Sequence, residues 1–241
     1  MKYAIISDVH GNLQALQAVL AKIDGTGVDQ IICLGDVVGY NADPNQCIQI
    51  IRERTIPTIC GNHDAVACGL EEPWGFNPIA LSAALWTREH LSPENYEWLA
   101  KLPNSLKFEH FFAAHGSPTN RDTYLFTWED VAPHFAYLVQ EGRTICFFGH
   151  THCPGIFTPD GAYNIGAEGR FPLERDKLYF INPGSVGQPR DGDPRAAFGV
   201  FESESWVYEL VRQPYSVQES AERIRQSGLP QFLADRLLIG R

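Results

Sequence analysis

The sequence predicts an α/β (α+β) fold in which two mixed β-sheets pack together and helices cover their outer faces. Three observations support this fold class. Between residues 1 and 60, short β-rich runs alternate with segments of helical periodicity, which is typical of βαβ units with parallel strands. The middle of the chain is mostly helical, whereas Gly155–Leu210 has the pattern of short strands separated by glycine and proline. No low-complexity linker or internal repeat divides the chain, so we expect a single domain over residues 1–241.

The N-terminal quarter is expected to hold three strands and two helices. The apolar residues of each helix recur at helical spacing, and Asp43 is the expected N-cap of the second helix. Each strand is followed directly by a glycine or an aspartate. The predicted strands are Tyr3–Ser7, Gln30–Leu34 and Ile56–Cys60, and the predicted helices are Asn12–Ile23 and Pro44–Arg54.

A helical insertion is expected around residues 71–102, and two short helices are expected at residues 216–239. Proline stands at the start of both helices of the insertion, and Ser92 is the expected cap of the second. The predicted helices are Pro78–His90, Pro93–Lys101, Glu129–Glu141, Ser216–Gly228 and Pro230–Ile239. The predicted strands before Gly155 are the hairpin Leu106–Phe108 and Phe111–Ala114, followed by Ile145–Phe148.

Composition and charge exclude several classes of protein. The chain has 29 acidic and 19 basic residues, a formal charge of −10, which disfavours binding to long nucleic acids or anionic membranes. No run approaches the ~18 apolar residues that a membrane-spanning helix needs. The first residues lack the apolar region and cleavage site of a secretory signal, and the six cysteines contain no CxxC pair. These features predict a cytoplasmic protein without a membrane partner and leave its oligomeric state open.

Five polar blocks follow predicted strands. Asp8 and His10, two residues apart on an extended segment, are expected to point the same way. Taken singly, each block has a plain structural explanation, such as a turn or a satisfied core histidine. Because strand ends meet at one edge of a sheet, their joint occurrence favours a shared site. The blocks are Asp8-Val9-His10, Gly35-Asp36 with Gly39, Gly61-Asn62-His63-Asp64, His115-Gly116 and Gly149-His150-Thr151-His152.

The donor atoms of these blocks are too many for one tetrahedral metal ion. They suit two ions if one carboxylate bridges them. Mixed imidazole and carboxylate donors favour Mn, Fe, Zn, Ni or Co over Ca or Mg, and Mn²⁺ is our first expectation. Two such ions, ~3.5–4 Å apart, clamp an in-line displacement at phosphorus. The candidate ligands are Asp8, His10, Asp36, Asn62, His115, His150 and His152.

These motifs resemble those of the calcineurin-like metallophosphoesterases. All five blocks are intact between Met1 and Cys153. Asn182–Arg190 is similar to the small bacterial branch that includes phosphodiesterases and diadenosine tetraphosphatases, so the resemblance extends to about Phe201. It implies a four-layer α/β/β/α sandwich. It also implies the ligand sets: Asp8, His10 and His152 for one ion, Asn62, His115 and His150 for the other, and Asp36 as the bridge.

The resemblance further implies a catalytic role for His63, as general acid or cationic clamp beside the leaving group, with Asp64 orienting its imidazole. The expected reaction is in-line attack on phosphorus by a hydroxide that bridges the metals, without a covalent phospho-enzyme. The expected substrate is a small phosphorylated molecule, either a phosphodiester or a nucleotide. Diadenosine tetraphosphate hydrolysis, Ser/Thr protein phosphatase-like monoesterase activity and a catalytically silent metal-binding scaffold remain alternatives.

Residues next to these blocks are candidate substrate contacts. Tyr40 and Asn41 follow the second block and could contact a leaving group, although a packed turn explains them equally well. Arg190 could bind a second phosphate or pair with Asp191. An aromatic cluster at residues 124–128 is either a substrate platform or part of the core.

Overall fold

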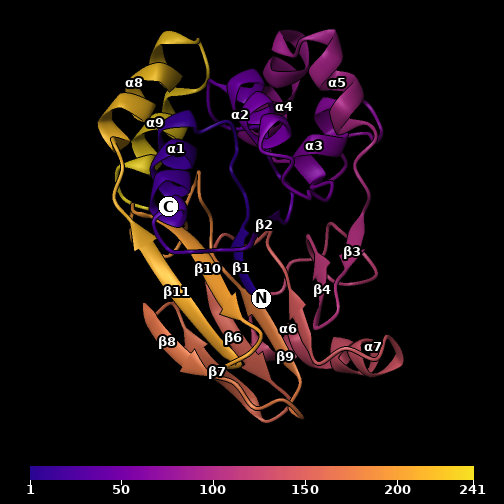
Figure 1. Cartoon of the computed structure of the whole chain (residues 1–241). Coiled ribbons are helices and arrows are strands. Elements are labelled where there is room, and N and C mark those ends of the chain that lie inside the picture. The colour runs from indigo at the N-terminus through magenta and orange to yellow at the C-terminus, as the bar shows by residue number, and fades with distance from the viewer.

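The computed structural model describes residues 1–241 and contains two β-sheets packed face to face (Figure 1). The first sheet has five strands in the order β2-β1-β10-β11-β8, and the second has six in the order β3-β4-β5-β9-β6-β7. Strands β1 and β2 are parallel, as are β4, β5 and β9, while the other neighbours are antiparallel. Both sheets are therefore mixed, as predicted.

The strands are β1 (Lys2–Ile6), β2 (Gln30–Cys33), β3 (Ser105–Lys107), β4 (Phe111–Ala114), β5 (Ile145–Phe147), β6 (Gly155–Thr158), β7 (Gly161–Ile165), β8 (Gly169–Pro172), β9 (Tyr179–Asn182), β10 (Ala196–Glu202) and β11 (Val207–Gln213). The helices are α1 (Leu13–Asp24), α2 (Pro44–Glu53), α3 (Asn62–Ala67), α4 (Pro78–His90), α5 (Pro93–Leu99), α6 (Trp128–Val131), α7 (Phe135–Gln140), α8 (Val217–Gln226) and α9 (Gln231–Leu237), with a 3₁₀ turn at Ala132–His134. None of the helices is long and apolar enough to cross a bilayer.

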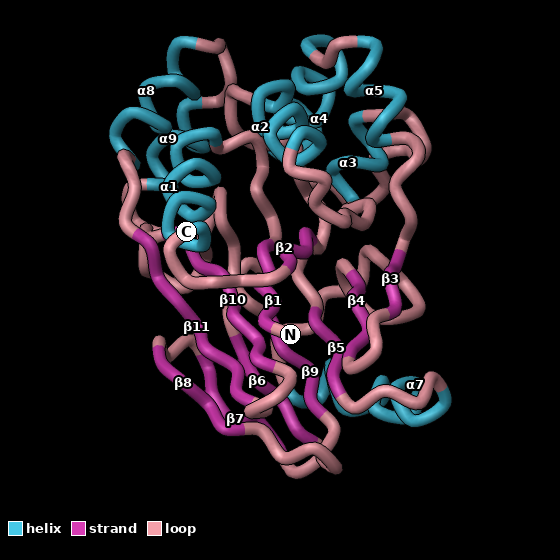
Figure 2. The backbone as a smooth tube through the Cα atoms, viewed as in Figure 1, coloured by secondary structure: helices cyan, strands magenta, loops and turns pink.

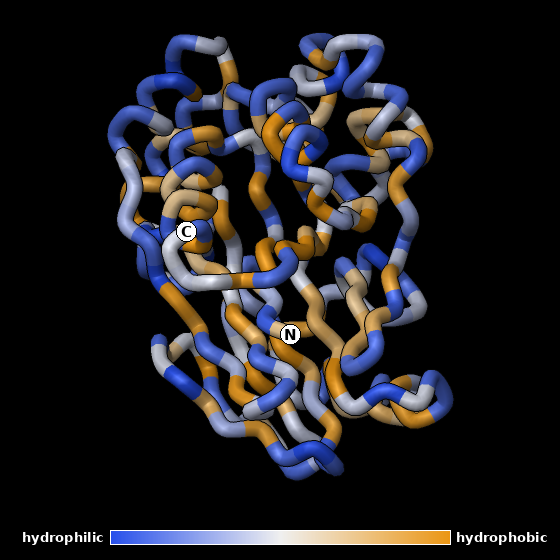
Figure 3. The backbone as a smooth tube through the Cα atoms, in the orientation of Figure 1, coloured by the Kyte–Doolittle hydropathy of each residue, from blue (hydrophilic) through white to orange (hydrophobic).

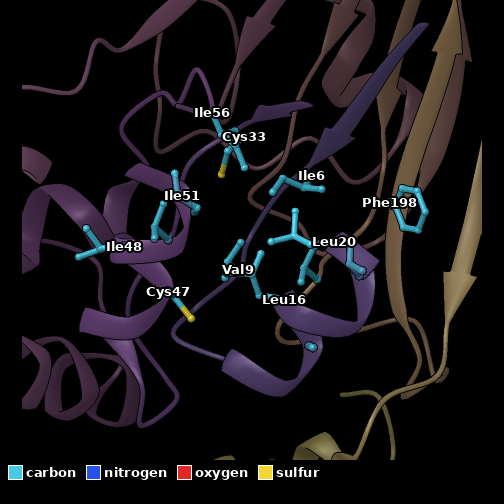
Figure 4. Close-up of a cluster of buried hydrophobic side chains, with 14 of the residues drawn as sticks. Ile6, Val9, Leu16, Leu20, Cys33, Cys47, Ile48, Ile51, Ile56 and Phe198 are labelled. Carbon is cyan, nitrogen blue, oxygen red and sulfur yellow. The ribbon is translucent and has the colours of Figure 1, made fainter. Parts of the chain in front are cut away.

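Alternate residues of each central strand face different layers, which produces the four-layer sandwich. Ala4 and Ile6 of β1 belong to one buried cluster with residues of helices α1 and α2, and Figure 4 shows Ile6 near Leu16 and Leu20 of α1. Tyr3 and Ile5, pointing the other way, lie in the core between the sheets with residues of β4, β5 and β10. The outer face of the second sheet is covered by α6 and α7, so the predicted α/β/β/α order is confirmed. In Figure 3 hydrophobic segments lie along the strands, and hydrophilic segments are common in the turns that join them.

Two of the predicted elements differ from the structure: one predicted strand is not a strand, and one predicted helix is broken into shorter pieces. Ile56–Cys60 is not a strand, because only Thr58 bridges to β2 and the Cys60 N–H donates to Pro103 instead. The helix predicted over Glu129–Glu141 is broken into α6, a 3₁₀ turn and α7 around Pro133, which has no N–H to continue the ladder.

The C-terminal helices pack close to the polar strand ends. Buried residues of α8 and α9 form one apolar cluster with α4 and with Tyr40, which lies in the loop after β2. Asp43 occupies the N-cap position of α2 but caps nothing with its side chain; it pairs with Arg223 of α8. The loops that join strands to helices, shown in pink in Figure 2, therefore lie between the sheets and a covering set of helices.

Candidate metal centre

The polar blocks that follow β1, β2, β4 and β5, together with the first turn of α3, meet at one end of the two sheets. The backbone holds them there: the Asp8 N–H donates to Gly35 O at 3.0 Å, and the His10 N–H donates to Asp36 O at 2.8 Å. The loop after β9 supports the same segment, because the Ser185 hydroxyl donates to Asp8 O at 2.8 Å. All seven candidate ligands are buried: Asp8, His10, Asp36, Asn62, His115, His150 and His152.

Most of these ligands have an unusual backbone conformation. Eight non-glycine residues of the chain have positive φ, and five of them are candidate ligands, at φ values between 49° and 66°. Such conformations cost about 1–3 kcal/mol each and concentrate at functional sites. The five are Asp8, His10, Asp36, His150 and His152. Asp8 and His10 therefore converge through left-handed turns, and the expectation that an extended segment aligns them is wrong.

A first group of donors consists of Asp8, His10, Asp36 and His152, whose ligand atoms all lie within 4.8 Å of one another. The Nε2 atoms of His10 and His152 are 3.0 Å apart. Asp8 Oδ1 lies 3.3 Å from His152 Nε2, and Asp36 Oδ2 lies 3.5 Å from His10 Nε2. Four donors therefore surround a single point.

A second group shares Asp36 and adds His115 and His150. The Nε2 atom of His115 lies 3.4 Å from Asp36 Oδ2 and 3.1 Å from Asn62 Oδ1. The Nε2–H of His150 donates a hydrogen bond to the carbonyl oxygen of Asp122 at 3.2 Å. The Nδ1 atom of His150 is therefore unprotonated and free to bind a metal ion. Asp36 Oδ2 is thus common to both groups and lies between them.

Backbone carbonyls determine which nitrogen of the His10 and His152 rings is protonated. A carbonyl oxygen only accepts, so the Nδ1 atom that faces it must carry the hydrogen. His10 donates in this way to Val38 O at 2.9 Å, and His152 donates to Gln188 O at 2.6 Å. Burial lowers the pKa of both rings, which are therefore neutral. Their Nε2 lone pairs face each other, and that arrangement is favourable when a cation lies between them.

The shared carboxylate has one unsatisfied oxygen. Asp36 Oδ1 accepts the His63 backbone N–H at 2.8 Å, whereas Oδ2 is buried and accepts no hydrogen bond. Burial alone would raise the pKa of Asp36, but His115 and His63 outweigh it and hold the pKa well below its usual range. A buried anionic oxygen without a donor is costly unless a cation satisfies it. The donor set therefore fits a pair of divalent ions.

The Asp36 carboxylate also changes the pKa of His115. Burial disfavours the charged form of this ring, but the Asp36 carboxylate outweighs burial and raises the pKa of His115 to about 9. The Nδ1–H of His115 donates to Leu34 O at 2.8 Å, which keeps Nε2 directed at Asp36. The ring is therefore protonated at pH 7 in the metal-free protein, where it forms an ion pair with Asp36, and a metal ion bound at Nε2 would replace its proton.

His63 lies at the rim of the centre. Its ring is 4.9 Å from that of His10, 4.4 Å from Tyr40 and 4.7 Å from Phe76, measured between centroids. Burial lowers the pKa of His63 to about 4, so the ring is neutral at pH 7 in the free protein, and its Nδ1 has no hydrogen-bond partner.

Asp64 does not orient His63, which corrects the prediction. Its two carboxylate oxygens accept the backbone N–H groups of Gly61 at 3.0 Å and Val38 at 3.1 Å. The physical reason is that α3 begins at Asn62, so Asp64 is the third residue of a helix and folds back onto the N-cap as in a capping box. Asp64 joins the start of α3 to the loop that follows Asp36.

Of the three candidate substrate contacts, Asn41 has a structural role, whereas Tyr40 and Arg190 lie beside candidate metal ligands. The side-chain amide of Asn41 donates to His10 O at 2.9 Å, which is a structural contact. Tyr40 is buried with its ring 4.6 Å from that of His10, and the Arg190 guanidinium lies 5.5 Å above the Tyr40 ring. Arg190 donates to Gln188 Oε1 at 3.0 Å and does not pair with Asp191, whose partner is Arg212.

Sequence reasoning gave no role in the site to Asn182 or Phe76, whereas Tyr124 belongs to the aromatic cluster predicted as either a substrate platform or part of the core. Asn182 donates to Gly149 O at 2.8 Å and so holds the histidine-bearing loop after β5. Tyr124 stacks on the ring of His150 at 3.9 Å, and Phe76 packs against His63. No sequence motif marks Phe76, so only the tertiary fold reveals its position beside His63.

Replacing Gly39 by alanine is expected to displace His63 without emptying the centre. Gly39 has φ +94°, and an added Cβ would lie 2.6 Å from His63 Nδ1. We expect turnover to fall at least about tenfold, about 1.4 kcal/mol, while bound metal stays near that of the wild type. Gly27→Ala is the matched control, because Gly27 also has positive φ (+67°) but open space around it. Equal turnover in the two variants would contradict this placement of His63.

Replacing Asp64 by alanine is expected to destabilise the fold. Two buried N–H groups would lose their acceptor, at about 1–3 kcal/mol each. Thermal unfolding measures the loss, and Asp130→Ala, which removes an exposed capping box on α6, should cost only about 1 kcal/mol. A variant with wild-type stability but altered pH dependence of turnover would restore the role of Asp64 as partner of His63.

Known proteins resemble this chain in both sequence and overall structure. A family model described as a calcineurin-like phosphoesterase superfamily domain matches residues 1–205. An uncharacterized protein of Methanocaldococcus jannaschii is 38% identical over 242 residues, which cover 99% of this chain and 98% of that protein. The crystal structure of a metallophosphoesterase from Sphaerobacter thermophilus superposes with a TM-score of 0.88 at 36% identity, covering 100% of this chain and 99% of that one. Phosphodiesterase YfcE of Escherichia coli is 22% identical over 208 residues, covering 85% of this chain and 89% of that protein.

Proposed function

Because this chain belongs to the calcineurin-like phosphoesterase superfamily, we propose that it is a phosphoesterase that works with two divalent metal ions. The observation that carries the proposal is the pair of donor groups that share Asp36 Oδ2, a buried anionic oxygen without a hydrogen-bond donor. Histidines lie on both sides of it, with the Nε2 atoms of His10 and His115 directed at this oxygen. Structural packing gives no reason for this arrangement.

The residues present would hold one ion at each donor group. Asp8, His10 and His152 would hold the first, Asn62, His115 and His150 the second, and Asp36 would contact both. When bound, such ions supply Lewis acidity at phosphorus and acidify water toward neutral pH. Manganese is the metal we propose, with iron, zinc, nickel and cobalt also compatible with mixed imidazole and carboxylate donors.

His63 is the residue proposed to act on the leaving group. Its ring borders the centre without belonging to either donor group. The negative charge of a bound phosphate would favour protonation of this buried ring, which could then donate to the leaving oxygen. Asp64 contributes indirectly, because its carboxylate connects the start of α3 to the loop after β2.

A small phosphodiester or nucleotide-type ester is the proposed substrate. The support is the distant likeness to a protein named as a phosphodiesterase, together with the net charge of −10, which disfavours long nucleic acids. Diadenosine tetraphosphate hydrolysis and monoesterase activity are the competing assignments within the same chemistry.

The test compares bis-p-nitrophenyl phosphate with p-nitrophenyl phosphate, using protein loaded with Mn²⁺. We expect the diester to be hydrolysed faster, the activity to disappear with a chelator, and added Mn²⁺ to restore it. Hydrolysis of the monoester alone would contradict the diester preference. No turnover with manganese, iron, zinc, nickel or cobalt would contradict the assignment as an enzyme and favour a silent scaffold.

A further inference from the structure

A cavity of about 150 Å³ opens beside the second donor group. Asn62 and His150 form the side of the cavity that adjoins the centre, and aromatic residues from two distant segments form much of the rest. One segment is the loop before α4, with Trp74 and Phe76, and the other contributes Tyr124. A cavity of this volume accommodates an aromatic ring.

Two of the three aromatic side chains around this cavity, those of Trp74 and Tyr124, are exposed to solvent. Trp74 is 88% exposed, although tryptophan is on average a highly buried residue. Tyr124 stacks on His150 at 3.9 Å and on Phe126 at 5.3 Å with nearly parallel rings, so its orientation is fixed. An exposed tryptophan on the same cavity as a fixed aromatic stack is typical of a site for a planar ligand.

The polar lining of the cavity is acidic. Glu71 and Asp122 both form ion pairs with Arg121, whose positive charge offsets part of their negative charge. Glu72 also lines the cavity, and its carboxylate makes no ion pair or hydrogen bond within the protein. A second phosphate would be repelled here, whereas a ring with an exocyclic amino group, which offers two N–H donors, would be favoured over one that presents mainly carbonyl oxygens.

We propose that this cavity binds the base of a nucleotide whose phosphate lies at the metal centre, with a preference for bases that carry an exocyclic amino group. The inference rests on the proposed function, since the occupant must be attached to the phosphate next to Asn62 and His150. A nucleotide joins a planar ring to a phosphate through a short sugar. It can therefore place its ring against the aromatic residues and its amino group near the acidic residues while its phosphate stays next to Asn62 and His150.

The test measures equilibrium binding by calorimetry to protein loaded with Mn²⁺, using adenosine 5′-monophosphate, uridine 5′-monophosphate and ribose 5-phosphate. Stacking predicts that the adenine nucleotide binds about tenfold more tightly than ribose 5-phosphate. The acidic lining predicts that it also binds more tightly than the uracil nucleotide. Equal affinity for the adenine nucleotide and ribose 5-phosphate would overturn the proposal, and equal affinity for the two nucleotides would overturn the amino-group preference.

Trp74→Ala is the informative variant, because Tyr124 touches the candidate ligand His150 and its loss would disturb the centre itself. We expect the ratio of affinities for the adenine nucleotide and ribose 5-phosphate to fall severalfold in Trp74→Ala, and any change at the centre cancels in this ratio. Tyr163→Ala, which removes another exposed aromatic side chain on the edge strand β7, should leave the ratio unchanged. An unchanged ratio in Trp74→Ala would contradict the proposal.

Binding and turnover separate the two hypotheses. A protein that prefers the adenine nucleotide in calorimetry but hydrolyses no ester would refute the proposed function and leave the base site standing. A protein that hydrolyses methyl p-nitrophenyl phosphate, which carries no base, but binds the adenine nucleotide and ribose 5-phosphate equally would refute only the base site.

Discussion

Replacing Asp36 by asparagine is expected to remove most bound metal and to lower turnover by at least about a thousandfold, which is about 4 kcal/mol of transition-state free energy. Asp36 Oδ2 belongs to both donor groups, so its loss weakens both sub-sites at once. No other residue of the centre is shared in this way. Metal content by mass spectrometry and turnover of bis-p-nitrophenyl phosphate measure the two effects.

The substitution should leave the fold intact. The remaining amide oxygen can still accept the His63 N–H, which Asp36 Oδ1 now accepts at 2.8 Å. The new amide NH₂ would replace Oδ2 and could donate to the Nε2 atom of His10. We therefore expect the metal-free variant to melt no lower than the metal-free wild type, while added Mn²⁺ no longer raises its melting temperature.

Asp43→Asn is the matched control, because Asp43 is another buried aspartate but pairs with Arg223 of α8. It should lose stability through this broken pair and keep its metal and activity. If Asp36→Asn retained two ions per chain, or if both variants lost metal equally, Asp36 would not be the shared ligand.

Replacing His63 by alanine is expected to separate catalysis from metal binding. His63 lies outside both donor groups, so bound metal should remain near the wild-type level. Turnover of an ester with a poor alkyl leaving group should fall about 10²–10⁴-fold, the usual contribution of a positioned acid. With a p-nitrophenolate leaving group, which departs readily without a proton, the loss should be much smaller.

His134→Ala serves as the control, since His134 is a partly buried histidine on the outer side of the second sheet, next to α7. Full turnover of His63→Ala on the alkyl ester would show that His63 does not act on the leaving group. Loss of metal in His63→Ala would instead make it part of the metal centre.

The position of the site could be predicted from the sequence because its residues follow strands. Parallel strands β1 and β2 end together, as do β4 and β5, and polar residues directly after buried strands must gather at that edge. Helix periodicity was equally informative for α4, which spans Pro78–His90 as predicted. Local pattern and tertiary structure agree in these segments.

Other features depend on contacts that a local pattern does not contain. Asp64 has the same neighbours in sequence whether it orients His63 or caps α3, and the beginning of α3 at Asn62 decides between them. Ile56–Cys60 has β-rich composition, but the N–H of Cys60 is taken by Pro103 from a distant segment. Trp74 belongs to a region predicted only as a helical insertion, and its place on the cavity depends on how that region folds over the centre.

The most direct test of the central claim, two metal ions bridged by Asp36, is anomalous diffraction at the manganese edge from crystals grown with Mn²⁺. The account predicts two peaks about 3.5–4 Å apart on either side of Asp36 Oδ2. One should contact His10 and His152, and the other His115 and His150. A single peak, or peaks that do not touch Asp36, would contradict the account.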